Sequence, residues 1–212
     1  MARRVKTRTQ NSSLRREQAT LTRARIIEGA AAVFELRGYE GARIEDIAKE
    51  AGVAVPTVYK VFTNKRSLLK ASVDAAMTGG GTGEVKRQAW FREQLEEPIA
   101  EDQLRLIARN ARRIYDHAGQ LLEVVRAAAA SDSDIEALWQ TINNERLTRS
   151  RMSARRLATK AKLRTTVAGA ARTLWTLSGP ELYVLQIRGG GLDPGDYERW
   201  LGDLLVAALL GA

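Results

Sequence analysis

The sequence predicts an all-α protein of about nine helices, with an N-terminal helix-turn-helix domain followed by a larger C-terminal helical domain. Apolar residues recur at spacings of three and four along most of the chain, as they do on one face of an amphipathic helix. No segment alternates convincingly between apolar and polar residues, as a half-buried strand would. Near the N-terminus, two short helical segments joined by a glycine-containing turn follow a longer one, which is typical of a helix-turn-helix.

The composition excludes several classes of site. The chain has 212 residues and no cysteine, so it has no disulfide framework, thiolate nucleophile or zinc site of the cysteine type. No apolar run reaches the roughly 18 residues of a membrane span, and the basic N-terminus lacks an apolar signal segment. We therefore expect a cytoplasmic protein without a membrane partner.

The positive charge is concentrated toward the N-terminus. Residues 1–78 contain 15 Lys and Arg against 8 Asp and Glu, whereas residues 79–212 contain 19 against 17. Most of the net charge of +9 therefore lies in the first third of the chain. A basic end on a near-neutral body favours contact with a polyanion. A merely solvated basic tail is the alternative.

The N-terminal third begins with an arm and a long helix. Residues 1–18 are basic and lack periodicity, so they are expected to form a disordered arm. The helix-turn-helix domain is predicted over residues 19–66. Its first helix begins at Thr22, presents an apolar face, and ends at Gly38, a residue type that suits a helix C-terminus.

Three shorter helices follow. The second carries acidic residues in its first turn, where the helix dipole favours anions, and ends at Gly52. The third has Pro56 in its first turn, where the missing N–H of proline costs nothing. Asn64 is a suitable N-cap for a fourth helix over residues 65–77.

Residues 67–212 are predicted to form the C-terminal helical domain. Residues 79–83, GGGTG, are expected to be a flexible break. From residue 103 the pattern is helical nearly to the end. Residues 121–130 are apolar almost all round and are expected to be central and buried, and a long helix is expected over residues 134–163.

The N-terminal third resembles the TetR family of bacterial transcription regulators, of an actinobacterial type. The resemblance is carried by TRARIIEGAAAVFELRGYEGARIEDIAKEAGV followed by TVYKVFTNKRSLL. It implies DNA binding, a dimer formed by the last helices, and a small-molecule pocket enclosed by the middle helices. Two departures affect DNA recognition: Arg43 stands where a hydroxyl residue is common, and residues 54–56 lack the usual polar base-reading residues.

The third helix is expected to enter the major groove of DNA, as the second helix of a helix-turn-helix does. Val55 and Thr57 would then lie nearest the base edges, while Tyr59 and Lys60 would reach phosphates. Tyr59 packing on the domain core and Lys60 being merely solvated are the alternatives. The predicted DNA contacts are Thr22 and Lys65 at helix N-termini, where free N–H groups favour phosphate, and Arg43, Val55, Pro56, Thr57, Tyr59 and Lys60.

An unknown small-molecule effector is expected between helices of the C-terminal domain, because such sites are apolar with a few convergent polar groups. For each aromatic candidate, plain core packing is the alternative, and for Arg126 it is an ion pair with Glu123. The basic residues of 146–164 are interpreted as a solvated face, with DNA or an acidic partner as the alternative. The candidate pocket residues are Trp90, Phe91, Tyr115, Arg126, Trp139, Trp175 and Tyr183.

A homodimer is expected to form through residues 166–177 and 196–210, because the apolar stripe there is too extensive to leave exposed. Burial of the stripe within one subunit is the alternative. The candidate dimer residues are Leu174, Leu201, Leu204, Leu205, Ala208 and Leu209.

No cofactor, metal site or enzymatic activity is expected. His117 is the only histidine, and it is interpreted as lying after a helix end, against the helix dipole. The sequence contains no phosphate loop and no credible nucleophile–base pair. The predicted function is a ligand-responsive transcription regulator, a repressor, that binds a palindromic double-stranded DNA operator as a dimer. A ligand-independent DNA-architectural protein is the alternative, and an enzyme is third.

Overall fold

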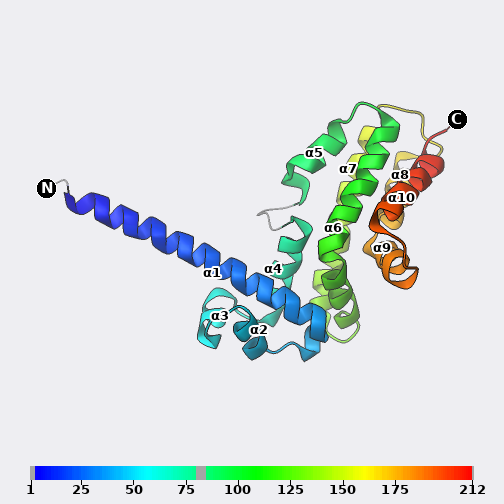
Figure 1. Ribbon diagram of the computed structural model, residues 1–212. Coiled ribbons are helices and arrows are strands. Elements are labelled where there is room, and N and C mark those ends of the chain that lie inside the picture. The colour runs from blue at the N-terminus through cyan, green and yellow to red at the C-terminus, as the bar shows by residue number, and fades with distance from the viewer. Residues whose placement is uncertain (1–2, 80–84, 212) are drawn as a thin grey trace. The chain divides into compact units, whose positions relative to one another are not determined.

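The computed structural model describes residues 3–79 and 85–211, with side chains from residue 14 onward, and this part of the chain is helical (Figure 1). No strand occurs in it, only an isolated antiparallel bridge between Leu163 and Leu210. The all-α prediction is therefore confirmed. The described elements are α1 Arg3–Gly41, α2 Ile44–Glu50, α3 Val55–Val61, α4 Lys65–Met77, η1 Val85–Arg87, α5 Ala89–Glu96, α6 Ala100–Ala128, α7 Ser133–Ala158, α8 Val167–Leu177, α9 Pro180–Val184, η2 Leu185–Gly189 and α10 Pro194–Leu209.

The chain divides into two compact units, Met1–Ser72 and Val73–Ala212. The division lies inside α4, six residues later than the predicted boundary between residues 66 and 67. The first half of α4 belongs to the N-terminal unit, and its Leu68 and Leu69 are fully buried. The Ser72 hydroxyl also lies 3.3 Å from the carbonyl oxygen of Ile27 in α1.

The first helix is longer than predicted. α1 begins at Arg3, so the expectation of a disordered arm over residues 1–18 is not met by residues 3–18, and residues 1 and 2 lie outside the described part. No glycine or proline precedes Gly29, so nothing in the backbone chemistry of this stretch stops a helix. The predicted break at Gly38 is present as a residue with φ 69° inside α1.

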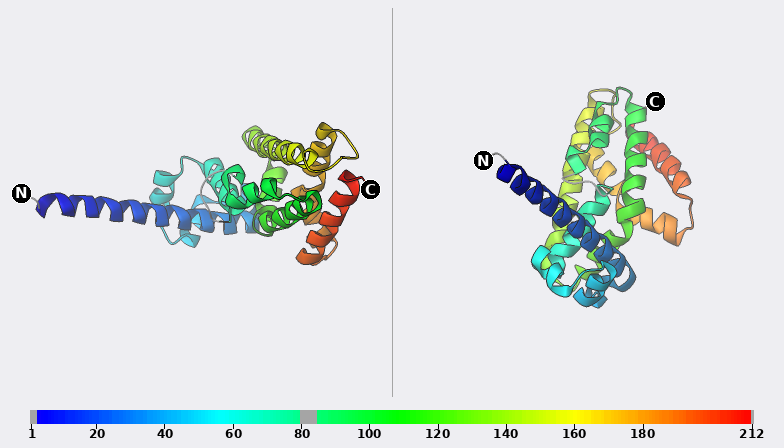
Figure 2. Two further views of the ribbon diagram at one scale, coloured as in Figure 1. Left: turned by 90° about the horizontal axis from the view of Figure 1, so that it is seen from above. Right: turned by 60° about the vertical axis from the view of Figure 1, so that its left-hand side comes forward.

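The C-terminal unit is built around α6. Leu104, Leu121, Leu122 and Val125 on this helix are fully buried, and α6 packs against α5, α7, α9 and α10. α7 packs in turn against α8, as the two further views in Figure 2 also show. The predicted long helix ends at Ala158, five residues early. Of the predicted break at 79–83, residues 80–83 lie outside the described residues.

Candidate functional site

The turn between α2 and α3 is fixed by two contacts from α1. Gly52 in this turn has φ 63°, in the left-handed region that favours glycine. The Arg25 guanidinium donates hydrogen bonds to the carbonyl oxygens of Ala51, at 2.7 Å, and Gly52, at 3.1 Å. A Cβ on Gly29 would lie only 2.8 Å from the Ala51 nitrogen, so α1 can pack this closely only with glycine there.

α3 presents one face to its own core and another to solvent. Val58 and Phe62 are buried, with exposed fractions of 1% and 5%. Tyr59 is 54% exposed, and Lys60 and Pro56 are also exposed. Val55 and Thr57, at the start of the helix, are half-buried. The residues expected to meet DNA are therefore brought together on the outer face of α3.

Arg43 lies at the start of a helix, as the prediction of a DNA contact requires, whereas Thr22 does not. Arg43 stands at the N-cap of α2, is exposed, and makes no side-chain capping hydrogen bond. Thr22 was expected at a helix N-terminus, but it lies in the middle of α1 because that helix begins at Arg3. Its backbone N–H is therefore inside the helix and is no phosphate site of the kind predicted.

Lys65 has a structural role that the sequence did not indicate. Its ammonium lies 4.5 Å from the centre of the Tyr39 ring and 3.2 Å from the carbonyl oxygen of Ala42. These contacts hold the start of α4 to the end of α1. The N-terminus of α4 is capped as predicted, because the Asn64 side-chain oxygen accepts a hydrogen bond from the Ser67 N–H at 2.8 Å.

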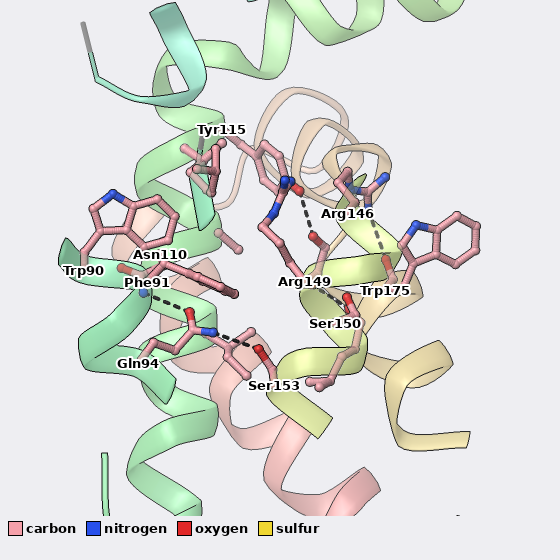
Figure 3. A pocket seen from close by; sticks show the side chains of 16 residues that line it. Trp90, Phe91, Gln94, Asn110, Tyr115, Arg146, Arg149, Ser150, Ser153 and Trp175 are labelled. Carbon is pink, nitrogen blue, oxygen red and sulfur yellow. Dashed lines mark hydrogen bonds between the residues drawn. The ribbon is translucent and has the colours of Figure 1, made fainter. Parts of the chain in front are cut away.

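The C-terminal unit contains a cavity of about 70 Å³ between α5, α6, α7 and α8 (Figure 3). Four of the seven predicted pocket residues line it, namely Trp90, Phe91, Tyr115 and Trp175. The Tyr115 hydroxyl donates a hydrogen bond of 2.8 Å to the carbonyl oxygen of Ser178. Burial raises the pKa of Tyr115, although the nearby Arg146 and Arg149 oppose this shift.

The other three predicted pocket residues do not line this cavity. Arg126 pairs with Glu123, with 2.7 Å between guanidinium and carboxylate, which is the alternative given for it above. Tyr183 is buried, and its hydroxyl donates to Asp116 at 2.5 Å. Burial, and then Asp116, raise the pKa of Tyr183. Trp139 lies half-buried on α7.

A buried chain of polar side chains lines one wall of the cavity and was missed from the sequence. The Asn110 amide donates to Gln94 at 3.0 Å, and the Gln94 amide donates to the Ser153 hydroxyl at 3.1 Å. Figure 3 shows these bonds running from α6 to α5 and on to α7. All three residues are at least 94% buried. A polar residue at an otherwise apolar helical spacing was the available signal.

Two arginines of the cavity correct the expectation of a solvated basic face over residues 146–164. Arg146 donates to Asn143 at 2.8 Å and to the Trp175 carbonyl at 3.0 Å. The Arg149 side chain is only 15% exposed, and burial lowers its pKa. The spacing of Ile142, Arg146, Arg149 and Ser153 places them on one helical face, which could have indicated burial.

The predicted dimer stripe is mostly buried within the subunit. Leu201, Leu205 and Leu209 are fully buried, and Leu174 is 1% exposed, because α10 packs on α6 and α8. Only Leu204 and Ala208 of the predicted set are half-buried. The expectation for His117 is also wrong, because it lies within α6, eleven residues before the end of that helix.

Comparisons with known proteins find a family match within the N-terminal unit. Residues 26–72 match the family described as bacterial regulatory proteins, tetR family. The curated regulator TtgR of Pseudomonas putida is 42% identical over 60 residues, which are 28% of this chain and 29% of that protein. The chain therefore matches under a third of the length of this relative.

Longer matches are weaker in sequence. The repressor KstR of Mycolicibacterium smegmatis is 29% identical over 143 residues, covering 58% of this chain and 70% of that protein. The solved structure of FadR from Bacillus subtilis, in complex with stearoyl-CoA, is similar with a TM-score of 0.69 at 20% identity. That match covers 87% of this chain and 97% of FadR and supports the fold.

None of the helices among the described residues combines the length and the apolar composition that a membrane span needs.

Proposed function

Because the chain belongs to the TetR family of bacterial regulatory proteins, we propose that it is a transcription repressor that binds palindromic DNA as a homodimer. A small molecule bound in the cavity of the C-terminal unit lowers its affinity for that DNA. One observation carries the proposal: α3 buries Val58 and exposes Pro56, Tyr59 and Lys60. This exposed face is the one that the second helix of a helix-turn-helix presents to the major groove.

On DNA, α3 enters the major groove with its N-terminal end leading. Val55 and Thr57 then lie nearest the base edges, where Val55 can contact a thymine methyl group. Tyr59 and Lys60 contact phosphates, as does Arg43 at the start of α2. Phosphate contacts supply affinity and register, and the base contacts supply sequence preference.

The dimer must use other residues than the buried leucines of α10. The outward sides of α8 and α10 remain available, with Val167 at 38% exposed and Leu204 and Ala208 half-buried. A two-fold pair reads an inverted repeat whose half-sites lie about 34 Å, or one helical turn, apart. A stable monomer at micromolar concentration in light scattering would contradict this part of the proposal.

The cavity favours a ligand-responsive regulator over the alternatives. A ligand-independent architectural protein has no use for an internal cavity lined by polar and aromatic groups. An enzyme requires a base or nucleophile in the cavity, and the described lining residues include no carboxylate, histidine or lysine. Tyr115 is a poor base, because burial raises its pKa and its hydroxyl is bonded to Ser178.

Selection of bound DNA from a random pool tests the proposal. We expect an inverted repeat to be enriched. Lys60→Ala should weaken binding to all sequences and reduce the slope of log affinity against log salt by about 1. Lys162→Ala, which removes the same charge from the C-terminal unit, is the matched control and should change neither. Recovery of no shared sequence would leave only nonspecific DNA binding and refute the proposal.

A further inference from the structure

The cavity of the C-terminal unit has an unbalanced positive charge. Arg146 is 6% exposed, and its closest carboxylate is Glu181 at 4.0 Å. Arg149 has its closest carboxylate, Glu145, at 3.9 Å, and that carboxylate is itself 60% exposed. Neither distance is that of a hydrogen-bonded pair. Because a buried charge is costly unless it is paired, these guanidiniums favour an anion in the cavity.

The two arginines differ in how far they are already engaged. Arg146 is held by Asn143 and by the Trp175 carbonyl, and its guanidinium carbon lies 5.8 Å from the centre of the Trp175 ring. The Arg149 side chain makes no hydrogen bond in the described part of the chain, and its one ion pair, with Glu145, is long at 3.9 Å. Figure 3 shows it extending from α7 toward Tyr115. Arg149 is therefore the donor that remains for a ligand, and Arg146 adds a fixed positive charge beside it.

Beside the polar residues Gln94 and Asn110, the α5 and α6 side of the cavity carries large apolar side chains. Trp90 and Phe91 project from α5 (Figure 3), and Ile107 and Ile114 of α6 also line the cavity. A ligand that fits both walls has an anionic group at one end and an apolar body at the other. A bare inorganic anion would leave the aromatic wall unused.

The volume of the cavity limits which part of such a ligand it can hold. About 70 Å³ holds a carboxylate group but not a whole ring, since benzene occupies an engineered cavity of about 150 Å³. Trp90, Asn110 and Ile114 also line a second hollow of about 400 Å³ on the same unit. An apolar body therefore packs on Trp90 at the edge of this second hollow, whose remaining lining is largely polar and includes Arg112, Arg113 and Asp116.

We propose that the effector is a small organic carboxylate, whose oxygens accept hydrogen bonds from the Arg149 guanidinium while its apolar body packs against Trp90 and Phe91. This inference rests on the proposed function, because it assigns the chemical class of the effector. Planar guanidinium groups pair with carboxylates through two parallel hydrogen bonds, which suits a site of this size.

Matched neutral probes test the charge requirement in the unaltered protein. Benzoate and hexanoate are compared with benzamide and hexanamide by calorimetry on the full chain, together with inorganic phosphate. Each acid should bind about 10- to 100-fold more tightly than its amide, the range expected for a hydrogen bond to a charged group. Equal binding of acid and amide, binding of neither, or phosphate binding as tight as benzoate would overturn the proposal.

A pair of variants on α7 tests the residue. Arg149→Gln should abolish the preference for acid over amide, whereas Arg151→Gln, at an exposed position two residues away, should leave it unchanged. If the glutamine variant does not fold, Arg149→Lys keeps the charge and should retain part of the preference. An unchanged preference in a folded Arg149 variant would also overturn the assignment.

The DNA measurements separate this inference from the proposed function. Sequence-specific DNA binding that carboxylates leave unaltered, but another compound releases, would refute the effector class and keep the regulator. Carboxylate binding by a chain that selects no DNA sequence would keep the pocket chemistry and refute the regulator.

Discussion

Replacing Gly29 with alanine tests whether the close approach of α1 to the helix-turn-helix turn controls DNA binding. The added Cβ would lie 2.8 Å from the Ala51 nitrogen and 3.2 Å from both the Ala51 Cα and Cβ. Ordinary contact requires about 3.4 Å or more, so α1 and the turn must separate by about 0.6 Å. Such a shift lengthens the bond from Arg25 to the Ala51 carbonyl from 2.7 Å to about 3.3 Å.

Replacing Gly29 with alanine should destabilise the N-terminal unit, although alanine has the better helix propensity. Alanine gains up to about 1 kcal/mol over glycine within a helix. Overpacking costs about 1–3 kcal/mol, and weakening the hydrogen bonds of a charged group costs about 1 kcal/mol more at this partly exposed site. We expect a net loss of about 1–3 kcal/mol, which for a unit of this size lowers its Tm by about 4–24 °C.

The assay measures the thermal and denaturant unfolding of the variant. DNA affinity is then measured at a temperature at which the variant is folded. Gly41→Ala is the matched control on the same helix, because its Cβ would lie 3.4 Å from its nearest neighbour, the Arg37 Cβ. The control should be neutral or slightly stabilising. If Gly29→Ala were as stable as the control and bound DNA as well as the unaltered chain, the turn would not depend on this contact.

Four further outcomes are expected. Lys65→Ala should lower the Tm of the N-terminal unit as well as weaken DNA binding, because its ammonium packs on Tyr39, whereas Lys60→Ala should affect DNA binding alone; equal Tm values for the two variants would contradict this. Tyr197→Phe should be neutral or stabilising in urea unfolding, because the buried hydroxyl has no partner in the described part of the chain. Arg126→Ala should cost under about 0.5 kcal/mol, since its pair with Glu123 is half-exposed. Burial raises the pKa of Tyr197, so its ionisation should not affect stability below pH 10 and should lower stability progressively as the pH rises from 10 toward the higher pKa of the folded state; phenolate absorbance should therefore rise together with unfolding.

The helix-turn-helix could be predicted in detail because its signals are local. The proline of α3, the glycine of the turn and the cap at Asn64 each act through backbone geometry within a few residues. The exposed placement of Tyr59 and Lys60 follows from the buried positions of Val58 and Phe62 on the same short helix. Helical periodicity fixes such relationships without knowledge of any distant contact.

The errors involve contacts between residues far apart in the sequence. For Lys65, the predicted phosphate contact stays a prediction, but its packing against Tyr39 and Ala42, 26 and 23 residues away, was not expected. The leucines of α10 form the stripe expected of a dimer, yet α6 buries them within the subunit. An apolar stripe indicates that a helix face is buried. It does not indicate whether the same subunit or a partner subunit buries it.

Contacts between residues far apart in the sequence also explain why the burial of Arg146 and Arg149 was not predicted. In a sequence, Arg146 and Arg149 belong to a run of basic residues that suits a solvated face. In the fold, both guanidiniums are largely buried, and their nearest carboxylates lie 4.0 and 3.9 Å away, so each charge is only weakly compensated. An anion in the cavity would compensate these charges. It binds one conformation of the C-terminal unit better than another only if the two guanidiniums reach the anion in the first conformation and not in the second. Such a difference in affinity is the requirement for a ligand to shift a conformational equilibrium. The energy for regulation would therefore come from this weakly paired charge, so an Arg149→Met chain should be more stable than the unaltered protein and insensitive to carboxylates in both Tm and DNA affinity.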